Sequence, residues 1–367
     1  MRKMKIGFVG VGDISGIYLE NLTKKYKEVE IAGVCDLVRE KAERAVKKYG
    51  IPKLYEDMYE LFADEEVDIV LNITRPYEHY EVTKAALLAG KNVYSEKPLA
   101  TSLEKGKELV ALAKERGLVL GGAPDTFLGG AIQTAREMID RGDIGPIVGA
   151  AGYMKCRGHE SWHPDPEFYY KEGGGPMLDM GPYYVTAFVN LFGSVEWVTS
   201  MSRITYPERT ITSEPKAGQV IKVDVPTHVA GIMQFENGAI GTLTTSFDVF
   251  PAGSYDLIEV YGSEGTMIVP DPNNCGGKIR IRGKGDWEER DLTFDYGWNC
   301  RGLGLCDMAN AIRDGRTPRA NCGLTYHALE VMLALANAEG RREHVKIESR
   351  YDRMAPMCRG LEEGVLD

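Results

Sequence analysis

Lys97 stands between an acid and a proline, directly after a short apolar segment, 92–95. We predict that this segment is a buried strand of an α/β sheet, in which ligands bind at the carboxyl ends of the strands. An ammonium group there could donate a hydrogen bond to a substrate oxygen and lower the pKa of a hydroxyl. A cis bond before Pro98 would fix the direction of Lys97. A solvated lysine at the start of a helix is the alternative.

A carboxylate and a phenol follow in the segment 173–184, GGGPMLDMGPYY, which is predicted to open a helix that continues to Gly193. Asp179 and Tyr183 are four residues apart, so on a continuous helix their side chains share one face. Together the two groups can accept and relay a proton. In the alternative interpretation Tyr183 packs in the core and Asp179 caps the helix.

The segment 159–163, HESWH, matches the H-E-x-x-H pattern of zinc proteases. That chemistry needs a helix, but Pro164 disfavours the α conformation of the residue before it. We therefore expect no metal site. We expect instead a loop over a polyol substrate, with Trp162 stacking and His163 hydrogen-bonding. The substrate-binding residues predicted in this loop are Arg157, Glu160, Trp162 and His163.

The elements that would position these groups begin with an apolar run, 4–9, and the glycine turn GVGDISG at 10–16. An amphipathic helix pattern and a second apolar run, 29–35, follow. Strand, glycine turn, helix, strand and a final acid, Asp36, form the dinucleotide-binding unit. An ordinary glycine turn followed by a chance acid is the alternative.

Each residue of the turn has a predicted role. Gly10 permits the tight turn, and Gly12 lets the backbone approach a pyrophosphate, whose charge a helix N-terminus favours. Ser15 replaces the third glycine of the fingerprint and is still small enough for close packing. The cofactor-binding residues predicted here are Gly10, Gly12, Asp13, Ile14 and Ser15.

Asp36 lies about 20 residues after the turn, where a carboxylate can accept hydrogen bonds from the adenosine ribose. It would repel the 2′-phosphate of NADP, and a carboxylate cannot donate the hydrogen bonds that a phosphate accepts. We therefore predict NAD in preference to NADP. Arg39 is the nearest cation that could offset this effect.

Further cofactor contacts are predicted after the strand 67–73, where the sequence continues as TRPYEH. Thr74 and Pro76 are expected to line the cofactor. His79 could touch a ligand or could start and cap the next helix. Glu96 and Lys97, after the next strand, are placed at the same edge of the sheet.

Strand and helix patterns alternate through residue 122, which predicts a doubly wound parallel sheet. Two runs, 227–235 and 239–247, then flank Asn-Gly, the strongest short hairpin signal. Further segments are predicted as strands at 255–261 and 266–269, loops at 207–222 and 270–277, and helices at 130–141, 302–314 and 323–340. We predict a Rossmann domain, 1–124, and an α+β domain, 125–367, for substrate binding and oligomerisation.

The second domain is expected to carry a large, mainly antiparallel sheet with helices on one side. Apolar residues on the open face would need a cover, which another subunit usually supplies. We therefore predict a homodimer or homotetramer formed through this face. A polar, solvated face is the alternative.

The composition restricts the class of protein further. The chain has 367 residues, 43% of them hydrophobic, enough for two cores, and a net charge of −10 without a basic stretch, which argues against nucleic acid. No apolar run approaches the roughly 18 residues of a membrane span, and no signal peptide fits before the first strand. Seven scattered cysteines without a C-x-x-C pair are expected to be reduced thiols in a cytoplasmic protein.

Together these residues resemble the Gfo/Idh/MocA family, the glucose–fructose oxidoreductase and inositol dehydrogenase group, over nearly the whole chain. The resemblance implies a Rossmann domain, an α/β domain whose open sheets pair in dimers and tetramers, and hydride transfer between NAD(P) and a secondary hydroxyl of a sugar, inositol or sugar derivative. It is carried by Gly10-x-Gly12-x-x-Ser15, Asp36, Thr74–His79, Glu96-Lys97-Pro98 and Gly173–Tyr183.

The chain departs from the family pattern in two places. Many members carry D-x-G-x-H-x-x-D on the catalytic helix, where this chain has Tyr183 for the histidine and Thr186 for the last aspartate. Some members, glucose–fructose oxidoreductase among them, are similar in using a tyrosine. The arginine-bearing segment after the last parallel strand is PDTF here, and the resemblance places Asp125 against the nicotinamide or the substrate.

We therefore expect an NAD-dependent sugar or polyol oxidoreductase in which Lys97 polarises the reacting oxygen and Tyr183, helped by Asp179, exchanges the proton. The cofactor would supply the hydride chemistry. Two other functions fit the same fold. One is a glycosidase or lyase-type enzyme that retains NAD and oxidises the sugar transiently. The other is a non-catalytic NAD-sensing regulator, which the presence of all three residues argues against.

Overall fold

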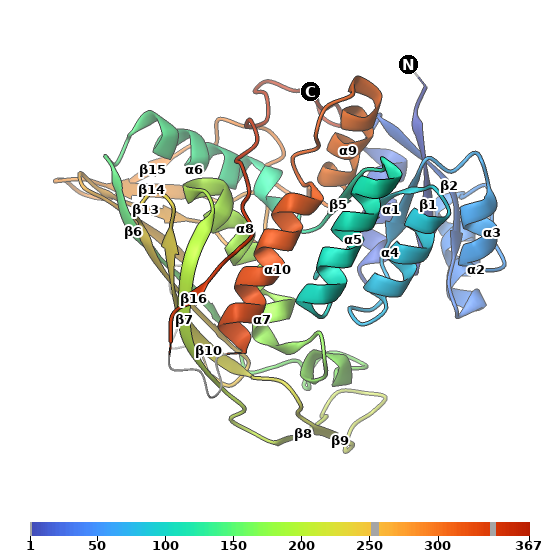
Figure 1. Cartoon of the computed structure of the whole chain (residues 1–367), viewed down its shortest axis with the longest axis horizontal. Helices are drawn as coiled ribbons and strands as arrows, with labels where there is room; N and C mark the ends of the chain where they lie inside the picture. Colours follow the sequence, from blue (N-terminus) through green and yellow to red (C-terminus); the bar gives the residue numbers. More distant parts are fainter. Residues whose placement is uncertain (1, 251–256, 338–342) are drawn as a thin grey trace. The chain divides into compact units, whose positions relative to one another are not determined.

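The computed structural model describes residues 2–250, 257–337 and 343–367 (Figure 1). Two compact units are present. Unit 1 comprises Met1–Gly129, Phe294–Tyr326 and Met354–Asp367, and unit 2 comprises Gly130–Thr293 and His327–Arg353. The boundary at residue 124 between the predicted Rossmann domain and the predicted α+β domain stays a prediction.

Unit 1 is built on a parallel sheet of five strands in the order β2-β1-β3-β4-β5. β3 is buried along its whole length, as expected for a strand covered on both faces. The chain runs from β1 to one side and then to the other, so the order reverses beside β1, where doubly wound folds bind ligands. The predicted parallel sheet is confirmed. Its strands are β1 (Met4–Val9), β2 (Val29–Cys35), β3 (Ile69–Asn72), β4 (Asn92–Ser95) and β5 (Leu120–Gly122).

Local chemistry explains where the helices of unit 1 begin and end. The Asp57 side chain accepts hydrogen bonds from two backbone N–H groups of α3, and Ser102 caps α5 in the same way. Gly117 ends α5 with a φ of +65°, which glycine adopts without strain. The helices are α1 (Ser15–Lys24), α2 (Arg39–Tyr49), α3 (Met58–Ala63), α4 (His79–Leu88), α5 (Leu103–Arg116), the 3-10 turn η1 (Thr126–Leu128) and α9 (Leu303–Asp314).

Unit 2 is built on a nine-stranded sheet in the order β15-β14-β13-β12-β6-β11-β10-β7-β16. Its strand pairs are antiparallel except for β6 and β11. The strands are β6 (Ile147–Lys155), β7 (Val195–Arg203), β10 (His228–Phe235), β11 (Ile240–Ser246), β12 (Ile258–Gly262), β13 (Thr266–Val269), β14 (Ile279–Arg282), β15 (Glu288–Arg290) and β16 (Val345–Lys346). This confirms the predicted α+β architecture with a mainly antiparallel sheet.

Helices lie against one side of this sheet, with α8 and α10 along it in Figure 1. The Ser200 hydroxyl of β7 donates to the Leu335 carbonyl of α10, which fixes that helix to the sheet. α10 begins in unit 1 and continues in unit 2. The helices are α6 (Gly130–Arg141), the 3-10 turn η2 (Glu167–Tyr170), α7 (Gly175–Asp179), α8 (Gly181–Phe192) and α10 (Cys322–Ala336).

The predicted hairpin is confirmed. β10 and β11 pair antiparallel with His228 opposite Ser246, and Gly238 in the turn has a φ of +84°. Along β10 exposed and buried residues alternate, as expected for a strand with one covered face. The alternation leaves a row of side chains on the uncovered face.

Three details differ from the sequence analysis. The predicted loop 207–222 contains two short paired strands, β8 (Glu208–Thr210) and β9 (Val220–Lys222). The predicted single helix from residue 173 is two helices, α7 and α8, that meet at Met180. The reason is Pro182, which has no N–H to donate to the carbonyl four residues earlier.

Two predicted elements lie partly outside the part of the chain that the structure describes. Residues 255–256 of a predicted strand and 338–340 of the last predicted helix are the ones concerned.

Five cysteines are free thiols, whereas Cys275 and Cys300 are disulfide-bonded. The expectation of seven reduced thiols is therefore wrong for these two, because sequence spacing does not reveal which thiols approach a partner. In the described ranges, none of the helices has the length and apolarity to cross a membrane.

Candidate functional site

The glycine turn follows β1 at the carboxyl edge of the unit 1 sheet. Gly10 has a φ of +96°, and a Cβ there would lie 2.7 Å from the Ile73 carbonyl oxygen, so a larger residue cannot fit. A Cβ on Gly12 would meet no heavy atom of the described chain within 4 Å, which leaves room for a ligand to approach the backbone. Ser15 begins α1, and its hydroxyl donates to the Gly12 carbonyl at 2.6 Å.

The first turn of α1 has no side chain that caps it. Two of its backbone N–H groups donate to backbone carbonyls, Ser15 to Gly12 at 3.0 Å and Ile17 to Ile14 at 3.3 Å. The positive end of the helix still favours an anion here, the arrangement that binds pyrophosphate in this type of fold. Asp13 and Ile14 lie exposed in the turn. The residues present thus fit a dinucleotide at this position.

Asp36 follows β2, as predicted, and ties the end of that strand to the glycine turn. One carboxylate oxygen accepts from the Val11 N–H at 2.6 Å, and the other accepts from the Val38 N–H at 2.7 Å. Each oxygen keeps a lone pair that could accept from a ribose hydroxyl. Arg39 is held by Glu43 at 3.1 Å and Glu56 at 2.6 Å.

His79 links the loops that follow β3 and β4. Its ring is buried, with Nδ1 at 2.7 Å from the Pro98 carbonyl oxygen and Nε2 at 3.0 Å from the Thr74 carbonyl oxygen. Burial lowers the pKa of His79 below its ordinary value. Asn72 supports the same loops by accepting from the Thr74 hydroxyl at 2.7 Å. His79 also starts α4, so its ring and its backbone both fix this edge.

Lys97 is half-buried, and its loop is fixed through Glu96. The Glu96 carboxylate accepts from the Tyr18 hydroxyl at 2.8 Å and from the Lys97 N–H at 2.9 Å. The Lys97–Pro98 peptide bond is cis, as expected. Pro76 lies half-buried in the preceding loop. Contacts of these residues with a cofactor stay predictions.

Asp125 is completely buried and stabilises the start of α9. Its Oδ2 accepts from the N–H groups of Gly302 at 2.7 Å and Gly304 at 3.3 Å, and its Oδ1 lies 3.9 Å from the Arg301 guanidinium. Burial raises the pKa of Asp125, although Arg301 and the two N–H groups act in the opposite direction. A structural role is therefore visible, and the expected contact with nicotinamide or substrate stays a prediction.

In unit 2, Asp179 is the last residue of α7, and Tyr183 lies buried in the first turn of α8. Because the helix breaks at Met180, the prediction that both side chains share one helix face does not follow from their spacing. A residue that the sequence analysis did not select, His159, places Nε2 at 3.4 Å from Asp179 Oδ2. No sequence signal joined the two residues, since His159 appeared only within the rejected zinc pattern.

The segment 159–163 forms turns, not the helix that a zinc protease needs. The Trp162 side chain is 61% exposed, whereas His163 is buried. His163 Nδ1 accepts from the Asp165 N–H at 3.0 Å, so the proton of the neutral ring lies on Nε2. In the described residues no group of three or more His, Cys, Asp or Glu side chains could hold a metal ion.

Glu160 belongs to a buried ionic network centred on Arg209. The Arg209 guanidinium donates to Glu160 at 2.6 Å and pairs with Asp248, and the Tyr170 hydroxyl also donates to Glu160. Burial opposes the charged form of Glu160, but the bonds from Tyr170 and Arg209 hold its pKa below the ordinary value. Arg209 was missed because its segment was predicted to be a loop.

Arg157 has aromatic partners in the same unit. Its guanidinium carbon lies 4.7 Å from the ring centroid of Tyr206 and 4.8 Å from that of Phe250. Its carbonyl accepts from Arg209 at 3.3 Å. The predicted substrate contacts of Arg157 and Glu160 stay predictions, and the structure shows both residues anchoring the loop 156–163.

Residues 4–122 match the oxidoreductase family with an NAD-binding Rossmann fold, and residues 132–268 match the GFO/IDH/MocA C-terminal domain. The chain belongs to the Gfo/Idh/MocA oxidoreductase family.

Several characterised proteins are similar to the chain. The scyllo-inositol 2-dehydrogenase (NAD(+)) of Bacillus subtilis (strain 168) is 26% identical over 92% of this chain and 94% of its own length. The D-glucoside 3-dehydrogenase of Escherichia coli (strain K12) is 28% identical over 66% of this chain and 70% of its own length. The structure of levoglucosan dehydrogenase in complex with NADH and levoglucosan is 20% identical, with a TM-score of 0.79, 95% of this chain and 100% of that chain being covered. The similarity to the levoglucosan dehydrogenase structure supports the two-part fold described above.

The Arg209 network makes a prediction about stability. Its Arg209 and Asp248 side chains are only 3% exposed, so Arg209→Met would leave buried carboxylates without their cation. We expect a loss of about 3–5 kcal/mol in the free energy of unfolding, measured by denaturant titration. The control is Lys278→Met, which breaks the exposed ion pair with Glu289 and should change stability little. Equal effects of the two variants would contradict the assigned role of the network.

Proposed function

We propose that this protein is an NAD-dependent dehydrogenase that transfers a hydride between the nicotinamide and a secondary hydroxyl or ketone of a sugar, an inositol or a sugar derivative. One observation carries the proposal. In the parallel register, Val9 lies opposite Cys35 and Asn72, and Asn72 lies opposite Ser95. The loops with the glycine turn, Asp36, Thr74 and Lys97 therefore leave one edge of the sheet at the same level.

The proposed roles follow from the chemistry of each group. NAD supplies a hydride acceptor at nicotinamide C4. Lys97 donates a hydrogen bond to the reacting oxygen and favours its deprotonated form. Tyr183 takes the hydroxyl proton, and Asp179 helps to relay it. In the reverse direction the same groups return the proton to the alkoxide.

The substrate class is supported by two further points. The exposed indole of Trp162 offers a flat apolar surface of the kind that packs on the C–H face of a sugar ring, and His163 carries an N–H donor beside it, with ring centroids 5.3 Å apart. Related proteins are named as dehydrogenases of inositols and glucosides. We propose the cytoplasm as the compartment on the basis of five free thiols, although disulfide-bonded cysteines are unusual there.

The first test is a screen of sugars, inositols and glycosides with NAD, followed by the absorbance of NADH. At least one substrate should produce NADH in proportion to its own oxidation, and Lys97→Met should abolish the signal. Turnover of a glycoside without NADH would favour an enzyme that recycles bound NAD. Tight NAD binding with no turnover of any substrate would favour a regulator.

The proton path is tested by Tyr183→Phe, which removes the phenolic hydroxyl and little volume. We expect kcat to fall by about 10²–10⁴-fold, with little change in NAD affinity. Lys97→Met should lose at least as much, because it also removes the positive charge. Tyr184→Phe is the matched control, since that hydroxyl donates to the Tyr153 carbonyl and should leave kcat nearly unchanged. Full activity of Tyr183→Phe would move the role to Asp179 or His163.

The cofactor preference is tested by comparing kcat/KM for NAD and NADP. We expect NAD to be preferred, because we assign Asp36 to the adenosine ribose and because Arg39 forms ion pairs with two glutamates. Asp36→Ser should reduce the ratio of kcat/KM for NAD to kcat/KM for NADP. Glu40→Gln removes a nearby charge without touching the glycine turn and should leave the ratio unchanged. A preference of the unaltered protein for NADP would refute this assignment.

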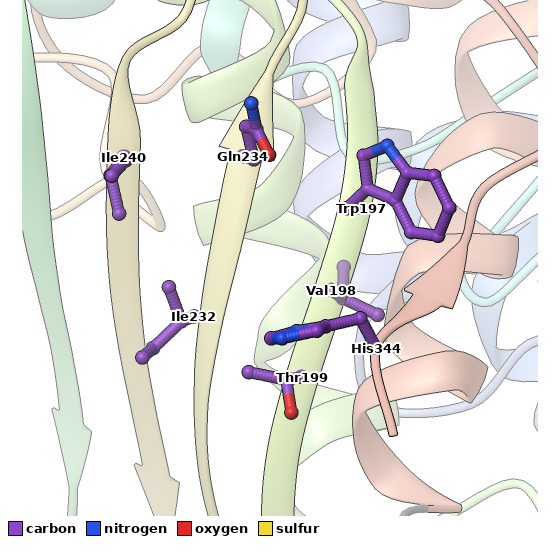
Figure 2. Close-up of a pocket in the computed structure, with 7 residues that line it drawn as sticks. All are labelled: Trp197, Val198, Thr199, Ile232, Gln234, Ile240 and His344. Atoms are coloured by element: carbon purple, nitrogen blue, oxygen red, sulfur yellow. The ribbon is translucent and has the colours of Figure 1, made fainter.

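The open face of the unit 2 sheet supports a homo-oligomer. The strand register aligns Trp197 of β7, Gln234 of β10 and Ile240 of β11 in one row, and Thr199 with Ile232 in the next. Figure 2 shows these side chains and His344 lining a recess on the sheet. Large apolar groups on a sheet face usually mark an interface. We propose that a second copy of the chain covers this face.

The prediction is that charge on this face dissociates the oligomer. Ile232→Lys combined with Met201→Glu, which alters a residue 83% exposed, should reduce the mass measured by light scattering toward that of one chain. Val220→Lys, an exposed position outside the nine-stranded sheet, should leave the mass unchanged. A single-chain mass for the unaltered protein would refute the proposal.

A further inference from the structure

His159 is held in a fixed orientation by its surroundings in unit 2. The ring is buried and packs edge-on against Tyr169, with ring centroids 4.0 Å apart. Phe247 and Trp162 contact it at centroid distances of 4.5 Å and 5.3 Å. The backbone N–H of His159 also donates to the Tyr170 hydroxyl at 3.1 Å. These contacts leave Nε2 directed at Asp179, 3.4 Å from Oδ2.

The Asp179 carboxylate needs such a partner because its own helix does little to orient it. α7 is only five residues long and ends at Asp179, and the backbone breaks at Met180 before α8 begins. The direction of the side chain relative to Tyr183 therefore does not follow from helix geometry. A contact from another segment of the chain can supply that direction.

Electrostatics reinforces the contact. Burial disfavours the imidazolium, but the hydrogen bond to Asp179 and the thiol of Cys156 outweigh it and raise the pKa of His159 to about 9. His159 is therefore a cation at neutral pH. Asp179 at the end of α7 and Cys156, which directly follows β6, are the ionisable groups that act on it. A cation beside Asp179 favours its carboxylate form.

We propose that His159 is a positioning residue for proton transfer, which holds Asp179 as a directed carboxylate through its Nε2–H. The inference rests on the proposed function, in which Asp179 relays the proton that Tyr183 accepts. The other ring nitrogen, Nδ1, is buried, has no hydrogen-bond partner in the described part of the chain and is shielded from solvent. It acts through Asp179 and is not itself a catalytic residue.

Two variants separate the donor from the charge. His159→Gln keeps an N–H at a similar reach but is neutral, whereas His159→Leu loses both. We expect kcat of His159→Leu to fall about 10–100-fold with KM for NAD nearly unchanged, because a misdirected carboxylate affects proton transfer and not cofactor binding. The kcat of His159→Gln should be much closer to that of the unaltered protein than the kcat of His159→Leu.

The pH profile supplies a readout that a purely structural role would not change. Removing the cation raises the pKa of the neighbouring carboxyl, so the acidic limb of kcat for oxidation should move to higher pH in His159→Gln. If His159→Leu does not fold, this shift in the Gln variant remains the test. His228→Gln is the control, because His228 bonds Ser246 in the sheet and should shift nothing.

Three outcomes decide the inference. A lower kcat in His159→Leu, recovery in His159→Gln and the shifted limb support it. Unchanged kcat and pH profile in both variants, with Asp179→Asn impaired, overturn the inference and leave the proposed proton path standing. Full activity of Asp179→Asn and Tyr183→Phe would instead refute that proton path, and with it the positioning role.

Discussion

Backbone hydrogen bonding between parallel strands determines where the polar loops of unit 1 can lie. β1 pairs with β2 on one side and β3 on the other, so the ends of all three strands come to one level. The glycine turn, Asp36 and Thr74 each follow one of these ends within a few residues. β4 extends the row and places Lys97 on the same edge. The proposed chemistry of unit 1 depends on this alignment, since a shift of register would separate the loops.

Buried polar side chains then hold these loops in place. Asn72, His79 and Glu96 each accept or donate hydrogen bonds to backbone groups of the loops after β3 and β4. A buried polar group without a partner costs free energy, so each contact resists alternative loop conformations. Rigid support of this kind is what a reacting group needs, because small displacements of a catalytic side chain reduce the rate strongly.

Unit 2 fixes its polar residues by different means. The loop 156–163 has no strand register to orient it, and Arg209 instead binds Glu160, Asp248 and the Arg157 carbonyl. Such a network is stable only while every charge is paired, which makes it sensitive to the loss of one member. The aromatic rings around His159 add packing that directs its imidazole toward Asp179.

The sequence by itself determined the local elements and the residues that end them. Glycine turns, alternation of apolar residues and the Asn-Gly signal predicted the parallel sheet, the hairpin and the position of Lys97 and Asp36, because these patterns express backbone preferences within a few residues. Only the tertiary structure decided that His159 meets Asp179, that Arg209 binds Glu160, and that Asp125 supports α9. The break at Met180 is different, because Pro182 encodes it locally and the sequence analysis missed it. Contacts between side chains far apart in the chain depend on how whole elements pack, and neither spacing nor periodicity in one sequence encodes that packing.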